Sequence, residues 1–138
     1  MIMYFSGYQT SKELLDLKED FGLLTSYVEQ RKKKKVNFPT NRKIFLDSGA
    51  YSVLTGKVVI DIDEYIEFIK KHKKLLQVYA NLDVIGNHKQ TDYNQKYMES
   101  KGLSPLPSFH YGTEYKILKQ MIKEYNYIGL GGLVPIAM

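Results

Sequence analysis

The fold is indicated by one stretch of the chain, Lys43-Ile44-Phe45-Leu46-Asp47-Ser48-Gly49, in which an apolar run ends abruptly in polar residues and a glycine. The run from Lys43 to Asp47 is short and apolar, as expected for a strand that is covered on both faces in a parallel sheet. Functional side chains of parallel α/β proteins gather at the carboxyl ends of such strands. The stretch therefore predicts both a buried strand and a candidate site.

Similar strand patterns occur on both sides of this stretch, and helix patterns separate most of them. Capping pairs three residues apart, Thr10 with Glu13 and Asp61 with Glu64, mark two helix starts. The predicted strands cover residues 1–6, 23–28, 43–47, 77–84, 106–110 and 127–130, and the predicted helices cover residues 11–19 and 91–101 and begin after Asp61 and near Thr113. The 3.6-residue periodicity predicts two apolar helix faces, formed by Ile62, Tyr65, Ile66 and Ile69 and by Tyr115, Leu118, Ile122 and Tyr125. This alternation implies an α/β fold with a parallel sheet and helical crossovers. An open doubly wound sheet and part of a barrel both fit it.

Length and composition narrow the class of protein. The chain has 138 residues, 43% of them hydrophobic, and no cysteine. The length suggests one domain and is short for a complete (β/α)8 barrel, which takes about 250 residues. No apolar stretch is long enough to span a bilayer, and the N-terminus lacks the features of a signal peptide. We therefore expect a cytoplasmic protein with no membrane partner, no disulfide and no cysteine-bound metal.

The net charge of +5 comes from one basic run, Arg31-Lys32-Lys33-Lys34-Lys35. Without this run, positive and negative charges in the chain balance. The run comes just before Asn37-Phe38-Pro39, so we expect it on a loop that enters the next strand. A focused basic patch binds phosphates by releasing counterions, so these five residues are candidates for nucleic-acid binding. The alternative is a solvated loop without a partner, because charge runs are often only exposed.

Polar residues follow four consecutive predicted strands. Asp47 ends the third strand, Asp83 lies near the end of the fourth, His110 ends the fifth, and Gly131-Gly132 follow the sixth. Because parallel strands end at one rim, we expect two carboxylates, one imidazole and a glycine pair to lie together there. No dinucleotide-binding or P-loop glycine motif follows the first strand, so the common phosphate-loop functions lose support.

Each of these residues also has a structural interpretation. Asp47 could cap the turn at Ser48-Gly49. His110 could be a structural histidine, and the glycine pair a tight turn. Tyr51 either packs or stacks on a flat ligand. Asp83 lies among apolar neighbours, and an unpaired buried charge is costly, so it must be paired or functional.

A family resemblance follows from these motifs. Asp47-Ser48-Gly49-Ala50-Tyr51-Ser52 resembles the Asp-Ser-Gly-Gly-Phe/Tyr-Gln signature of tRNA-guanine transglycosylases. Asn81-Leu82-Asp83-Val84 falls where that family carries its base-recognising aspartate, and Tyr127 to Leu133 resembles its strand leading into a Gly-Gly-Leu loop. The order and spacing agree over residues 44–134. The stretch Gln95 to His110 is most similar to phage and bacterial relatives that act on DNA.

The resemblance implies a TIM barrel that replaces guanine in tRNA or DNA with a 7-deazaguanine base. In the family, an aspartate attacks C1′ of the nucleotide, expels guanine and forms a covalent glycosyl intermediate, which the incoming base then displaces. The target base must first leave its stack. We expect no cofactor for this exchange.

The resemblance also implies roles for named residues. Asp47 would accept the N9 proton of the incoming base, and the Tyr51 ring would stack on that base. Asp83 would accept the guanine N1–H and amino groups, because a carboxylate offers two acceptors to two donors. The remaining residues implied to bind the base are Ser48, His110, Gly131, Gly132 and Leu133.

The sequence departs from the family pattern in three places. Ala50 replaces a glycine and Ser52 replaces a glutamine. The family's nucleophilic aspartate follows the Gly-Gly-Leu strand, but no aspartate follows Leu133 in this sequence. We therefore expect a partial barrel of about six strands over residues 1–138, a fragment or split subunit that is inactive alone and needs a second subunit.

Two other functions remain open from the sequence. In one, Asp47, Asp83 and His110 bind a divalent metal at the rim of a TIM-barrel hydrolase or isomerase. In the other, the chain is a non-catalytic module that binds a base or nucleic acid.

Overall fold

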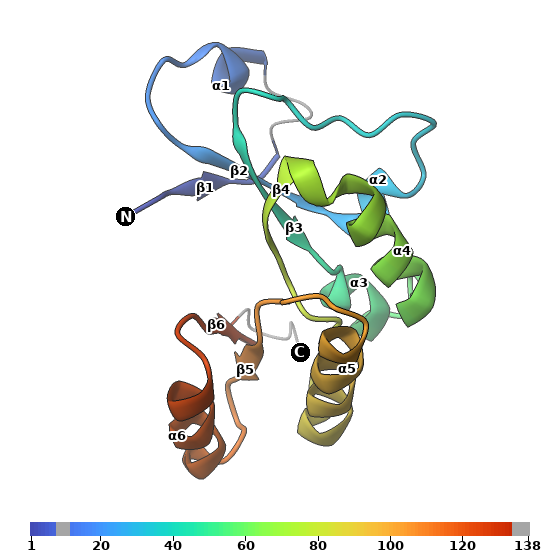
Figure 1. The fold of residues 1–138 in the computed structure, drawn as a ribbon, viewed down its shortest axis with the longest axis vertical. Helices are drawn as coiled ribbons and strands as arrows, with labels where there is room; N and C mark the ends of the chain where they lie inside the picture. Colours follow the sequence, from blue (N-terminus) through green and yellow to red (C-terminus); the bar gives the residue numbers. More distant parts are fainter. Residues whose placement is uncertain (8–11, 134–138) are drawn as a thin grey trace.

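The computed structural model describes residues 1–7 and 12–133. Four parallel strands form one sheet in the order β1 (Tyr4–Phe5), β2 (Gly22–Ser26), β3 (Lys43–Asp47) and β4 (Leu76–Tyr79). Two further strands, β5 (Ser108–His110) and β6 (Gly129–Gly131), pair in parallel. The predicted α/β class with a parallel sheet is therefore confirmed. Figure 1 shows the four-stranded sheet in the upper half and β5–β6 below it.

A single parallel bridge joins the two groups of strands. Ala80 and Leu106 pair directly after β4 and shortly before β5. The amide of Asn81 donates to the Leu106 carbonyl at 2.9 Å, and the amide of Leu106 donates to the Tyr79 carbonyl at 2.8 Å. All six strands are thus connected in chain order, and each lies beside the strand that precedes it in the sequence.

Helices connect the strands. They are α1 (Lys12–Asp16), α2 (Tyr27–Gln30), α3 (Ala50–Leu54), α4 (Ile62–His72), α5 (His88–Ser100) and α6 (Tyr115–Glu124), with a 3₁₀ turn at Lys73–Leu75. Asp61 caps α4 by accepting the Glu64 amide at 3.0 Å, as predicted. The predicted Thr10–Glu13 pair lies partly outside the described residues. In the part of the chain that the structure describes, no helix is long and apolar enough to cross a bilayer.

The core lies between the four-stranded sheet and α4. Leu23, Ile44 and Leu46 from the strands are fully buried, and so are Tyr65 and Ile69 on the predicted apolar face of α4. Burying a large aliphatic side chain contributes about 1.5–3 kcal/mol, so this layer supplies much of the stability. It also holds the carboxyl ends of β3 and β4 in place.

Several predicted boundaries differ from the structure. The predicted strand 23–28 ends at Ser26, because the Ser26 hydroxyl accepts the Val28 amide at 3.2 Å and starts α2. The predicted strand 77–84 pairs only as far as Ala80, because the side chain of Asn81 donates to the Thr91 carbonyl of α5. The helix predicted to open at Thr91 begins at His88, since Asn87 caps it.

The remaining differences concern short elements and α6. The first strand covers only Tyr4–Phe5 of the predicted residues 1–6, α1 ends at Asp16 rather than residue 19, and α3 was not predicted. Only part of the apolar face predicted for α6 is buried. Leu118 and Tyr125 are partly buried, but Tyr115 and Ile122 are exposed. The helix forms as predicted, but the described residues cover only part of its apolar face.

Candidate functional site

The predicted rim residues come from four neighbouring strands. Asp47, His110 and Gly131 are the last residues of β3, β5 and β6, and Asp83 lies four residues beyond β4. Because these strands are parallel and consecutive, they bring the four positions to one edge of the sheet. Local sequence determines where each strand ends, and strand pairing brings the ends together.

Asp83 is the centre of the site. The Ser48 hydroxyl donates to its Oδ1 at 3.0 Å, and His110 Nε2 lies 2.6 Å from its Oδ2. Ser48 is fully buried, and the side chains of His110 and Asp83 are 7% and 12% exposed. Asp83, predicted to be paired or functional, is paired. Ser48 and His110, which the resemblance implies contact a base, hold the Asp83 carboxylate in the structure.

This arrangement leaves hydrogen-bonding capacity on Asp83. A carboxylate has about four acceptor positions, and Ser48 and His110 occupy one on each oxygen. Each oxygen therefore keeps a lone pair. A charged acceptor of fixed orientation suits a planar ligand that presents two adjacent N–H donors.

Asp47 makes the hydrogen bond expected if it caps the turn at Ser48-Gly49, which was its structural interpretation. Its Oδ2 accepts the Gly49 amide at 2.9 Å. Gly49 has a φ of 93°, and a Cβ built on it would lie 2.5 Å from Val28 Cγ2. Glycine is required there by both conformation and space. The turn therefore fixes Asp47 against the start of α2.

The pKa of Asp47 is raised even though its carboxylate accepts the capping hydrogen bond. Burial raises the pKa of the Asp47 carboxyl, and the nearby negative charge of Asp83 raises it further. The amides of Gly49 and Ser48 oppose this increase in pKa. Two carboxylates close enough to interact, one with raised pKa, form the usual setting for proton transfer.

Tyr65 lies beneath the two carboxylates. It is fully buried, and its hydroxyl donates to the Ala80 carbonyl at 2.8 Å. Burial raises the pKa of Tyr65 well above its usual value, and Asp47 and then Asp83 add to that increase. Tyr65 is therefore a neutral donor that supports the rim. The sequence placed it on the apolar face of α4 but showed nothing of its link to the site.

The glycine pair closes the site on the side of β6. A Cβ on Gly131 would lie 2.7 Å from His110 Cδ2, so the imidazole packs directly on this glycine. The Tyr111 amide donates to the Gly131 carbonyl at 3.0 Å, and Gly132 has a φ of 70°. Gly131 thus leaves space for the His110 ring. Neither sequence interpretation of the glycine pair, a tight turn or a contact to the base, included this role.

Tyr51 and Leu133 lie at exposed positions. The Tyr51 side chain, in α3, is 49% exposed, and Leu133 is 66% exposed. Asp83 also borders a cleft of about 430 Å³ whose walls are largely aliphatic, formed by α3, the start of α4, the segment after β4, and Gln90 and Asn94 of α5. Among the residues that the structure describes, no Lys or Arg lines this cleft. It offers a ligand space beside the carboxylate.

The described residues provide little for a metal. Within residues 1–7 and 12–133, no three His, Cys, Asp or Glu side chains are arranged to hold one ion. The arrangement of Asp47, Asp83 and His110 gives no support to the metal-dependent alternative.

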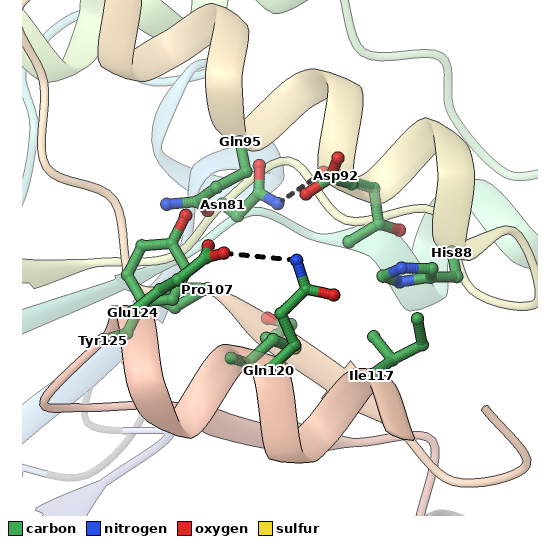
Figure 2. Close-up of a pocket in the computed structure, with 12 residues that line it drawn as sticks. Asn81, His88, Asp92, Gln95, Pro107, Ile117, Gln120, Glu124 and Tyr125 are labelled. Carbon is green, nitrogen blue, oxygen red and sulfur yellow. Dashed lines mark hydrogen bonds between the residues drawn. The ribbon is translucent and has the colours of Figure 1, made fainter. Parts of the chain in front are cut away.

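A second cavity lies between α5 and α6 (Figure 2) and contains none of the predicted site residues. The Asn81 amide nitrogen donates to the Thr91 carbonyl, and Gln120 donates to Glu124 at 3.3 Å. At one end, Tyr125 donates to Glu99 at 3.0 Å and accepts from Lys96 at 2.9 Å. The two bonds of Tyr125 join α5 to the end of α6, so we assign the cavity to the packing of these two helices.

The basic run is separate from the acidic rim. Lys32 to Lys35 are exposed on the loop that follows α2, and Arg31 is partly buried at its start. The predicted loop position is therefore confirmed. This loop borders a groove against α4.

Comparison with protein-family models, with curated proteins and with solved structures finds no match to this chain.

Proposed function

We propose that this chain is the base-binding part of a transglycosylase that exchanges guanine in a nucleic acid for a 7-deazaguanine. The observation that carries the proposal is the Asp83 carboxylate, held by Ser48 at 3.0 Å and His110 at 2.6 Å with a lone pair left on each oxygen. Guanine and its 7-deaza analogues present N1–H and an amino group side by side. Two charge-assisted hydrogen bonds would then select such a base.

Asp47 serves as the proton carrier in this proposal. A 7-deazaguanine loses its N9 proton as N9 forms a bond to C1′ of the nucleotide, and the bond from C1′ to the nucleophilic carboxylate breaks with its electron pair returning to that carboxylate. The Asp47 carboxylate takes that proton and becomes a neutral acid. Its raised pKa, caused by burial and by Asp83, makes it a better base than an ordinary aspartate.

We also propose that the parallel strands are a sector of a (β/α)8 barrel. The six strands are parallel neighbours in chain order, as in a barrel, whereas a doubly wound sheet reverses its order at a switch point.

A second polypeptide would complete the barrel. Within the described residues, β1 pairs only with β2 and β6 pairs only with β5. Phe5 on β1 and Leu130 on β6 are exposed, as are Tyr115 and Ile122 of α6. We propose that the polypeptide that completes the barrel also supplies the nucleophilic aspartate, which the resemblance places after the Gly-Gly-Leu strand.

Binding of the free base tests the role of Asp83 without a partner. Calorimetry or ligand-detected NMR would compare the native chain, Asp83→Asn and a matched control, Asp92→Asn on the exposed face of α5, with 7-deazaguanine as the probe. We expect at least tenfold weaker binding for Asp83→Asn, which is about 1.4 kcal/mol, because an amide turns one acceptor into a donor. Binding that is equal in all three proteins contradicts the assignment.

Base exchange tests the reaction itself. Labelled 7-deazaguanine would be supplied with tRNA or a DNA duplex, the native chain and the product of a neighbouring gene. We expect label in the polymer only when both proteins are present and Asp47 is intact. Base binding without exchange in any combination would instead favour the non-catalytic binding module.

A further inference from the structure

The groove between the basic loop and α4 has a volume of about 700 Å³. Its cationic lining residues come from two elements, Arg31, Lys33, Lys34 and Lys35 from the loop and Lys71 from α4. Glu64 and Glu67 also line it, so five fixed cations face two carboxylates. The groove therefore carries a net positive charge, and α4 adds a cation that the linear basic run does not include.

The loop that carries these cations is fixed at both ends by one buried residue. Gln30 is fully buried, and its side chain donates to Thr25 Oγ1 at 2.9 Å and accepts the Asn37 amide at 3.1 Å. Its backbone carbonyl accepts the Lys33 amide at 3.1 Å. The lysines are thus presented from an anchored backbone, unlike those of a freely solvated loop.

Arg31 is also held in place. Its Nη1 donates to the Val59 carbonyl at 3.0 Å, and its guanidinium lies 5.5 Å from the centre of the Tyr27 ring. Tyr27 in turn packs against Phe68, which packs against His72, with ring centres 5.1 Å and 4.6 Å apart. The wall formed by α4 is therefore aromatic, and Phe68 and His72 are partly exposed along it.

The groove is connected to the acidic rim through α2. Ser26, the last residue of β2, pairs with Asp47 of β3, and α2 begins at the next residue. Val28 of α2 packs against Gly49 in the Asp47 turn. The basic loop begins directly after this single helical turn, which spans about 6 Å.

We propose that this groove binds the sugar–phosphate backbone of the nucleic acid whose base is exchanged at the rim. Cations from two elements and exposed rings along one wall are the combination that holds single-stranded segments, in which phosphates meet lysines and bases or sugars pack on aromatic rings. An acidic protein or an anionic membrane would need the cations but not the concave aromatic wall. The inference rests on the proposed function, because it takes the polymer as the partner.

The experiment measures binding of fluorescent single-stranded DNA and RNA oligonucleotides over a range of salt concentrations. The test variant is Lys33→Gln/Lys34→Gln/Lys35→Gln. The control, Lys89→Gln/Lys119→Gln/Lys123→Gln, removes the same charge from exposed positions of α5 and α6. We expect at least a tenfold loss of affinity in the test variant alone. The slope of log affinity against log salt should fall by about 2, since each lost phosphate contact contributes about 0.7.

Three results would overturn the inference. The first is an equal loss of oligonucleotide affinity in the test and control variants, and the second is no oligonucleotide binding by the native chain. The third is binding to vesicles of anionic lipid that depends on the same lysines and that the oligonucleotide does not displace. The first two would show that the groove is not a site, and the third would identify a membrane as its partner.

Failure of this inference is distinguishable from failure of the proposed function. The groove variant keeps Asp83, so it should bind 7-deazaguanine like the native chain. If the oligonucleotide binds through the groove but the base does not bind at Asp83, only the proposed exchange fails. If the base binds and the groove variant holds the oligonucleotide normally, only the groove assignment fails.

Discussion

The carboxyl rim of the sheet and the groove beside α4 both gather charged side chains, but they differ in burial. At the rim, Asp47 and Asp83 are removed from water, and protein donors occupy part of each carboxylate. In the groove, Lys33, Lys34 and Lys35 keep their heads in solvent while a buried glutamine holds the backbone. Substitutions at the rim should therefore change the free energy of unfolding. Substitutions of the groove cations should mainly change the affinity for oligonucleotides and leave folding stability nearly unchanged.

The largest effect is expected for Asp83→Ala. The change removes the acceptor of a fully buried Ser48 hydroxyl and of the His110 ring. Unsatisfied buried groups each cost about 1–3 kcal/mol, so we expect a loss of about 3 kcal/mol in the free energy of unfolding. Urea denaturation measures it, with exposed Asp92→Ala as the control. Equal stability of the two variants would mean that the network contributes nothing to folding.

Gln30→Met tests the buried residue that anchors the basic loop of the groove. The substitution removes the side-chain bonds to Thr25 and to the Asn37 amide while keeping the volume. We expect a loss of about 2 kcal/mol, at about 1 kcal/mol for each net hydrogen bond, together with weaker oligonucleotide binding. Gln77→Met, at an exposed position of β4, should change neither quantity. Normal oligonucleotide binding by Gln30→Met would show that the loop needs no anchor.

Asp47→Asn should act in the opposite direction and stabilise the protein. Burial and the charge of Asp83 raise the pKa of Asp47, so the folded state holds its proton more tightly than the unfolded chain does. Its contribution to stability therefore falls as pH rises from the ordinary aspartate pKa to the raised one. At pH 7 we expect a gain of about 1 kcal/mol, because the amide keeps the Gly49 bond without the charge.

The gain should disappear at low pH. Below the ordinary pKa of aspartate, about 4, Asp47 is protonated in both states, so the native chain and Asp47→Asn become equally stable. Thermal unfolding from about pH 3 to pH 7 measures the difference. A gain that does not change over this range would place its cause outside the titration of Asp47.

The smallest effect on folding is expected for the triple lysine variant of the groove. Exposed substitutions away from buried networks usually change stability by less than about 0.5 kcal/mol. Lys33→Gln/Lys34→Gln/Lys35→Gln should therefore unfold at the native urea concentration while losing affinity for oligonucleotides. A clear change in its midpoint would show that these lysines belong to the folded framework, and the contrast with the rim would then fail.

Local patterns predicted the strand at Lys43–Asp47 and the start of α4 correctly, because strand composition and an Asp61 cap are properties of neighbouring residues. The same patterns overextended β4, which ends where the Asn81 side chain turns to α5. They also predicted an apolar face on α6 without showing that Ile122 would remain exposed. A pattern predicts which face is apolar but not what covers it.

The sequence alone determined that strands alternate with helices and that Asp47, Asp83, His110 and a glycine pair follow consecutive strands. Composition, caps and periodicity encode such features within a few residues. Only the tertiary structure decided that Ser48 and His110 both bind Asp83, from positions 35 and 27 residues away. The same is true of the groove that α4 forms with the basic loop. These contacts depend on strand register and on helix placement, which no short segment of the chain specifies.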